Sequence, residues 1–191
     1  MRIPRIPVIL LAGLMAGCAG QSSTKPVEAL DERTGVTIGA LKGPIELLPT
    51  VQSAGLILGK HLSFAYLGPV EWNRSGALSY GLWIHIAPGS DRQFGDIHAS
   101  AAVTLVLDDG PLTVSPTSAP ILGREPYRPV VSWGQTGYFG LTVETLRHMA
   151  ASKKLELAVR AADGSTVSFS PTLDTRAVLT QYMKDRAITA D

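Results

Sequence analysis

The sequence predicts a mainly β fold: an antiparallel β-sandwich or open barrel with one short internal helix and a C-terminal helix. Apolar and polar residues alternate in many short segments, most clearly over residues 78–86, and period two is typical of half-buried strands. Nineteen glycines and thirteen prolines punctuate the 191 residues, which favours short strands joined by turns over a helical bundle. The single cysteine excludes an intramolecular disulfide and a cysteine-rich zinc site.

The expected strands follow one another along most of the chain. Asp109-Gly110 and Asp163-Gly164 are dipeptides typical of tight hairpin turns, so each should join two neighbouring strands. The expected strands are residues 36–41, 45–48, 62–66, 78–86, 101–107, 112–115, 130–133, 138–142, 155–161 and 167–170.

Two segments show helical spacing instead. Residues 144–151 follow Thr142, a residue type that caps helix N-termini, and place their apolar side chains on one side. Residues 175–186 follow Asp174, a second capping residue, and carry an apolar stripe at intervals of three and four. We expect a short helix in the first segment and a longer C-terminal helix in the second.

Residues 34–191 are expected to form a single β-rich domain. If successive strands are antiparallel, their connections alternate between the two ends of the fold. The two longest loops, 87–100 and 116–129, then fall at the same end. Long loops in compact domains are often functional, so this end is the expected binding edge.

Residues 1–17 have the features of a signal peptide. Arg2 and Arg5 precede an apolar run over 8–16, which is shorter than the ~20 residues that a transmembrane helix needs. The stretch Leu14-Met15-Ala16-Gly17-Cys18 resembles the lipobox of bacterial lipoproteins. Residues 18–33 are polar and contain one proline, so we expect a lipidated cysteine followed by a flexible tether.

The resemblance implies cleavage before Cys18 and acylation of that cysteine. Two or three acyl chains on one residue anchor a protein to a membrane almost permanently. In proteobacterial lipoproteins an Asp after the cysteine marks inner-membrane retention, so Ala19 implies the outer membrane, with the domain facing the periplasm. The alternatives are the outer leaflet of the inner membrane and the cell surface.

The charge balance argues against a nucleic-acid partner. The whole chain has a formal net charge of +1, and the signal peptide that would be removed holds Arg2 and Arg5. The mature chain is therefore close to neutral, without a basic segment suited to phosphate backbones. Nothing in the sequence calls for a cofactor.

No sequence motif identifies an enzyme. The chain lacks the GxSxG nucleophile motif of the hydrolases that carry it. Asp91, Asp96 and His98 lie in one loop and are metal-ligand types, but their spacing matches no metal-binding motif. They are weak candidates for a metal site, and a solvated loop is the favoured interpretation.

Partner-binding candidates are Arg124, Tyr127, Arg128 and Trp133, in or next to the loop 116–129. These residue types dominate interface hot spots, and a loop with four prolines loses less conformational entropy on binding. The alternative is a loop packed over a sheet edge, with both aromatic rings in the core.

The leading hypothesis is therefore a non-enzymatic, lipid-anchored envelope protein. It would bind another envelope protein, or help to assemble one, through the long loops. One alternative is a module that binds a small ligand or lipid in a cavity between sheets. The other is a metal-dependent hydrolase that uses Asp91, Asp96 and His98.

Overall fold

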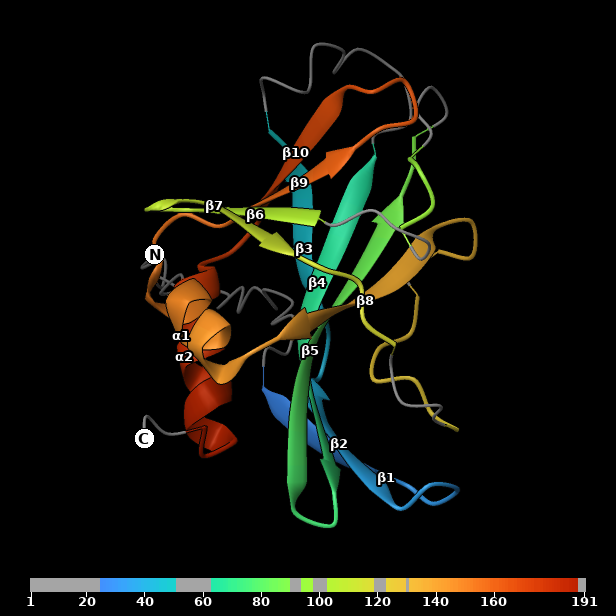
Figure 1. Ribbon diagram of the computed structural model, residues 1–191, viewed down its shortest axis with the longest axis vertical. Coiled ribbons are helices and arrows are strands. Elements are labelled where there is room, and N and C mark those ends of the chain that lie inside the picture. Colours follow the sequence, from blue (N-terminus) through green and yellow to red (C-terminus); the bar gives the residue numbers. More distant parts are fainter. Residues whose placement is uncertain are drawn as a thin grey trace, which may run out of the picture.

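The computed structural model describes residues 25–50, 63–89, 94–97, 103–118, 123–129 and 131–188. Its elements confirm the mainly β fold class, with one internal and one C-terminal helix (Figure 1). The strands are β1 (Pro26–Asp31), β2 (Val36–Leu41), β3 (Ile45–Pro49), β4 (Phe64–Arg74), β5 (Ala77–Ala87), β6 (Val103–Leu107), β7 (Gly110–Val114), β8 (Gln135–Leu141), β9 (Glu156–Arg160) and β10 (Thr166–Pro171); the helices are α1 (Val143–Ala151) and α2 (Thr175–Asp185).

All ten strands belong to one antiparallel sheet, which is not closed into a barrel. From one edge the order is β1-β2-β4-β3-β10-β9-β6-β7, and β5 and β8 extend the sheet from the other side of β4. A single bridge between Pro116 and Phe139 brings the chain after β7 back to β8. Strand β4 is therefore the centre of the fold, because three other strands pair with it.

Strands β2 and β3 lie end to end along one edge of β4. Ala40 is opposite Val70, and Ile45 is opposite Leu67. Between these two pairs lie four residues on the β2–β3 side, 41–44, but only two on β4, residues 68–69. The ladder is therefore interrupted there. Pro44 lies in this interruption, where its missing N–H disrupts no ladder bond.

Strand β1 corrects the expected extent of the tether. Residues 26–31 were expected to belong to the tether, yet they pair with β2 along their whole length. The sheet thus includes residues from Pro26 on, ahead of the expected domain start at residue 34. The alternation of β1 is weak because it is an edge strand, with both Val27 and Leu30 exposed.

Two further expectations about strands are wrong. The expected strands 62–66 and 78–86 left residues 68–77 as a connecting loop, but β4 continues through Gly68 and Pro69 to Arg74. Both lie opposite the interruption between β2 and β3, where β4 needs no ladder partner. A strand was expected over residues 130–133, but residues 131–133 form a bend and a turn before β8, and residue 130 lies outside the described residues.

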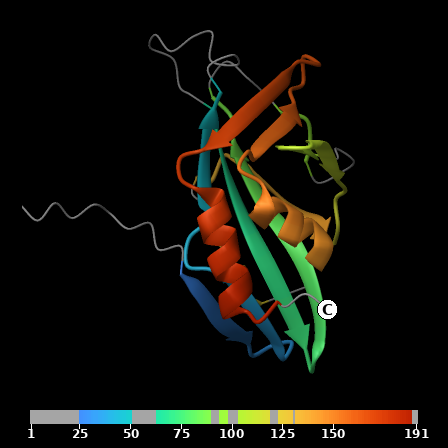
Figure 2. The same cartoon turned by 90° about the vertical axis from the view of Figure 1, so that its left-hand side faces the viewer.

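Both helices begin at the predicted caps. The Thr142 side chain accepts a hydrogen bond from the Thr145 N–H, and the Asp174 side chain accepts from the N–H groups of Arg176 and Ala177. Both helices lie on the same side of the sheet, and α2 runs along its face (Figures 1 and 2). Neither helix in the described part of the chain is long and apolar enough to cross a membrane.

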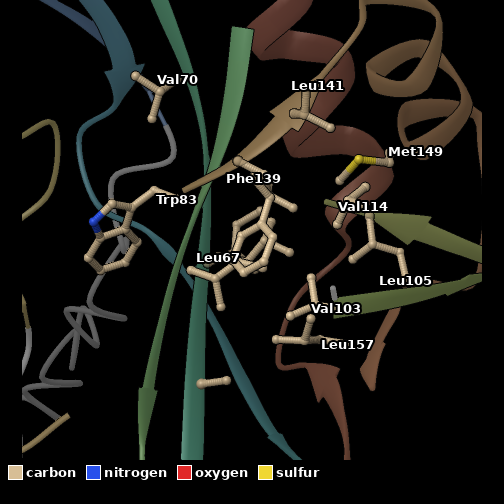
Figure 3. Packing of buried hydrophobic residues seen from close by; sticks show 14 of the residues in the cluster. Leu67, Val70, Trp83, Val103, Leu105, Val114, Phe139, Leu141, Met149 and Leu157 are labelled. Atoms are coloured by element: carbon tan, nitrogen blue, oxygen red, sulfur yellow. The ribbon is translucent and has the colours of Figure 1, made fainter. Parts of the chain in front are cut away.

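The sheet buries side chains on both faces. On the helix side, Phe139 and Leu67 pack with residues of β6, β9 and α1 (Figure 3). Trp83 points to the opposite, outer face of β5 (Figure 3). It lies directly across from Tyr138, and Tyr138 points to the face opposite to that of its neighbour Phe139. The outer face has a buried layer of its own, because Trp83 and His85 are fully buried.

Candidate interaction groove

A hollow with a volume of about 690 Å³ lies beside β1. One wall is the start of β1 with the chain after β2, and the other is the segment 124–128. We call it the β1 groove. Its lining residues are Val27, Glu28, Ala29, Lys42, Pro44 and residues 124–128.

Hydrogen bonds hold the segment 123–128 at both ends. At one end the Gly123 N–H donates to Asp31 Oδ2 over 2.8 Å. This bond, with a second from the Thr34 hydroxyl, holds the pKa of Asp31 below its ordinary value. At the other end the Tyr127 hydroxyl donates to the Pro69 carbonyl oxygen at 2.8 Å. The groove wall is therefore fixed to the sheet before any partner arrives.

The Tyr127 ring is the anchor of this segment. It is only 3% exposed and packs against Trp83, with 5.1 Å between ring centroids. It also lies directly over Gly68, where an added Cβ would come within 2.4 Å of the ring. The Leu41 N–H donates to the Tyr127 hydroxyl oxygen at 3.0 Å. Burial raises the pKa of this hydroxyl, which keeps it protonated.

The charges around the groove are unbalanced. Glu125 accepts a hydrogen bond from the Tyr138 hydroxyl, and Glu28 Oε2 pairs with Arg186 Nη1 at 3.1 Å. By contrast, Lys42, Arg124 and Arg128 form no ion pair with any residue that the structure describes. Of the two acids, Glu28 has a cation partner, whereas Glu125 has only the neutral Tyr138 hydroxyl and keeps its charge. Three cations without ion-pair partners in the described structure thus face one such carboxylate, so the groove has an excess of positive charge.

A buried ion pair supports the sheet beneath the groove. Arg186, which caps the end of α2, donates to the Glu71 carboxylate of β4 as well as to Glu28 of β1. The guanidinium lies over Gly39, where a Cβ would come within 2.6 Å of it. Burial opposes the charge, but the hydrogen bonds to Glu71 and Glu28 outweigh it, so the pKa of Arg186 is raised. The C-terminal helix thereby fixes the position of β1.

Two of the four predicted partner-binding residues belong to the groove as exposed side chains, namely Arg124 and Arg128. Tyr127 is buried, so its side chain holds the segment in place and offers no exposed ring to a partner. Trp133 is 65% exposed but lies in the turn before β8, outside the groove lining.

Lys42 and the β1 residues of the groove were not among the sequence candidates. Lys42 lies between two predicted strands, and the only notable sequence feature beside it is Gly43-Pro44. That dipeptide is typical of turns and does not indicate binding. β1 was expected to be tether. The long loop 87–100, expected beside the partner-binding loop, is described only at 87–89 and 94–97.

The metal candidates are not brought together by the described structure. Asp96 is exposed, while Asp91 and His98 lie outside the described residues, as does Cys18. Among the residues that are described, no three side chains of metal-ligand type gather at one place.

A second hollow, of about 530 Å³, lies between the residues after α1 and the start of α2. It contains Lys153, Lys154 and Arg176, but Lys154 already pairs with Glu156 at 3.5 Å. Like the β1 groove it is lined by three cations and two acids, but here only two of the cations, Lys153 and Arg176, have no ion pair with a described residue.

His85 is the other buried titratable group of the outer face. Its Nδ1 lies 2.8 Å from the Thr136 hydroxyl oxygen, and its ring stacks on Trp83 at 5.7 Å. Gly134 abuts the far edge of the imidazole, where a Cβ would come within 2.4 Å of Nε2. Burial lowers the pKa of His85, and a hydrogen bond with the Val131 backbone only partly opposes this. The imidazole is therefore held neutral, as a packing residue under the turn that carries Trp133.

Comparison of the chain with family models, with curated proteins and with solved structures finds no match.

Proposed function

We propose that this protein is a non-enzymatic, lipid-anchored protein of the bacterial envelope whose β1 groove binds another envelope protein. The observation that carries the proposal is the set of three cations without ion-pair partners in the described structure, Lys42, Arg124 and Arg128, around a groove whose walls are already fixed. A preorganised surface loses little entropy on binding. Unpaired charges at its rim steer a complementary partner and select against others.

The position of β1 supports a partner at or near the membrane surface. With lipid on Cys18, only six residues lie between the anchor and Lys25, which is seven residue steps away. Seven extended residues span at most about 25 Å. Lys25 lies beside the groove, because its carbonyl oxygen accepts a hydrogen bond from the Lys42 N–H at 2.8 Å. The anchor thus holds the groove within a short distance of the lipid headgroups, by resemblance those of the outer membrane facing the periplasm.

A small-molecule ligand is the alternative that the groove itself suggests, since its volume of about 690 Å³ falls within the ~300–1,000 Å³ of ligand pockets. Such pockets are mainly apolar with few polar groups. Five of the ten residues of this groove are charged, which favours a polypeptide partner.

Site-specific photo-cross-linking in native membranes tests the proposal. The photoreactive residue p-benzoylphenylalanine is placed at Lys42, at Arg128 or at Arg160 of the full-length lipidated protein. Lys42 and Arg128 face each other across the groove, whereas Arg160 is exposed on β9, away from its lining. We expect the same protein adduct from positions 42 and 128, none from 160, and a reduced yield when Arg124→Glu is added.

Equal adducts from all three positions, or none from 42 and 128, contradict the proposal. A small ligand in the groove gives no protein adduct at either position.

A further inference from the structure

We propose that the β1 groove binds its partner as an extended acidic segment, which joins the sheet as an additional strand along the free edge of β1. The inference rests on the function proposed above and names the chemistry and the geometry of the partner.

The free edge of β1 offers backbone hydrogen-bonding groups at defined residues. The Lys42 N–H donates to the Lys25 carbonyl oxygen, so these two residues form a hydrogen-bonded pair of the β1–β2 ladder. Such pairs alternate along antiparallel strands. Val27, Ala29 and Asp31 therefore turn their backbone groups towards β2, while those of Glu28 and Leu30 point outwards. No described strand other than β2 pairs with β1.

The groove follows this edge. It is lined by Val27, Glu28 and Ala29, three consecutive residues of one strand. Neighbouring side chains of a strand point to opposite faces, so a hollow that reaches all three runs along the edge. An added strand lies about 4.8 Å from its neighbour, and at that spacing its backbone meets the outward N–H and C=O groups of Glu28 and Leu30.

The charges select an acidic segment. Lys42, Arg124 and Arg128 line the groove without ion-pair partners in the described structure, while Glu28 pairs with Arg186 and Glu125 has only the neutral Tyr138 hydroxyl as its partner. Three cations against one carboxylate without a cation partner leave the groove positively charged. Acidic residues at every second position of an added strand share one face. That pattern lets two or three carboxylates meet the cations while the backbone extends the ladder.

A second copy of this chain fits the groove less well. The acids that its own β1 would bring are Glu28 and Asp31. Glu28 already pairs with Arg186, and Asp31 accepts hydrogen bonds from Gly123 and Thr34. A β1–β1 pair therefore brings no free carboxylate to the three cations. We infer a different polypeptide, with free Asp or Glu side chains at alternating positions.

The test measures binding of a defined probe, the fluorescein-labelled peptide Thr-Glu-Val-Glu-Val-Glu-Thr, by fluorescence anisotropy with the mature lipidated protein in detergent. The control probe has lysine in place of each glutamate. We expect saturable binding of the acidic probe only, weakened at least tenfold by Arg124→Glu combined with Arg128→Glu.

Leu30→Pro tests strand addition, because it removes an N–H that points away from β2 and leaves the β1–β2 ladder intact. Its matched control is Leu30→Ala, which keeps the N–H. We expect at least a tenfold loss of probe affinity for the proline variant and less than a threefold change for the alanine variant, with closely similar melting temperatures.

N-methylation of the probe tests the same hydrogen bonds without changing the protein. Methyl groups are placed on alternate backbone nitrogens, in either of the two possible registers. An added strand turns one set of N–H groups towards β1 and the other away. We therefore expect one methylated probe to lose binding and the other to retain it.

Several outcomes overturn the inference: no binding of the acidic probe, equal loss with Leu30→Ala and Leu30→Pro, or equal loss with both methylated probes. Self-association in sedimentation that Leu30→Pro abolishes, without probe binding, assigns the edge to a second copy and also overturns it. If the adducts from Lys42 and Arg128 persist unchanged in Leu30→Pro, the proposed function stands and only strand addition fails.

Discussion

The hydroxyl of Tyr127 donates a 2.8 Å hydrogen bond to the carbonyl oxygen of Pro69, at the place where β4 has no partner between β2 and β3. The Tyr127 hydroxyl oxygen in turn accepts a hydrogen bond from the Leu41 N–H at the end of β2. One side chain thus satisfies the backbone groups on both sides of a gap in the ladder. The segment that forms a wall of the groove is thereby tied to the centre of the sheet.

Tyr127→Phe should lower the free energy of unfolding by about 1–3 kcal/mol, because it leaves a buried N–H and a buried carbonyl without their partner. Urea denaturation measures the change. Tyr66→Phe is the control, since the Tyr66 hydroxyl meets only an exposed Glu46 at 3.5 Å and should change stability far less. Equal losses of stability in the two variants would show that the Tyr127 hydrogen bonds do not stabilise the interruption between β2 and β3.

Gly68→Ala should destabilise the protein by about 1–3 kcal/mol. The added Cβ would come within 2.4 Å of the Tyr127 ring, so the ring and the segment behind it must move. Gly43→Ala is the control, because nothing lies within 4 Å of a Cβ there. Thermal melting compares the two variants, and a Gly68→Ala protein as stable as Gly43→Ala refutes the close packing.

Arg186→Met should destabilise the protein by about 3 kcal/mol, because it leaves the Glu71 carboxylate buried without its partner. Glu71 is only 2% exposed. Adding Glu71→Gln to Arg186→Met should recover part of the loss, since the second change removes the unpaired charge. Denaturation of the single and double variants measures the coupling, and strictly additive effects would contradict it.

Acidification should destabilise the protein through His85. Burial holds the pKa of His85 below its ordinary value of 6.5, so the unfolded chain binds a proton more readily than the folded one. Stability is therefore lost as the pH falls below about 6.5, until the folded form is protonated as well. His85→Gln should reduce this loss between pH 7.5 and pH 5, measured by urea denaturation.

The control for this pH dependence is His148→Gln. His148 is an exposed histidine whose Nε2 lies 2.9 Å from Asp109. If the pH dependence persists in His85→Gln and disappears in His148→Gln, His148 rather than His85 causes it, and the prediction is wrong.

Cys18→Ser should abolish both lipid attachment and membrane retention. Incorporation of an alkyne-labelled fatty acid, followed by membrane fractionation, measures the two effects. Gln21→Ser, a nearby polar change, should alter neither of them. Labelling that persists in Cys18→Ser would disprove acylation at this residue.

Much of the architecture was predictable because it depends on local pattern. Alternation located the central strands, and Asp-Gly located the turn of the β9–β10 hairpin, where Gly164 adopts a φ of +83°. The capping residues Thr142 and Asp174 marked the helix starts. These signals act over a few neighbouring residues, so a single sequence displays them.

The candidate site was only partly predictable. The residue types of Arg124 and Arg128 marked them as candidates, while Lys42 and the edge of β1 carried no such mark. The residue type of Tyr127 alone does not show whether its ring faces solvent or the core. Its burial follows from the space that Gly68 leaves in a strand nearly sixty residues away.

The sequence by itself determined the strand-rich class and the helix caps, and its resemblance to a lipobox at Cys18 predicts an anchor there. Only the tertiary structure decided that the edge of β1, Lys42 and the segment 124–128 share one groove. The physical reason is that strand pairing and the buried contacts of Tyr127 join residues far apart in the chain. Such contacts depend on register and on complementary space, which local periodicity does not encode.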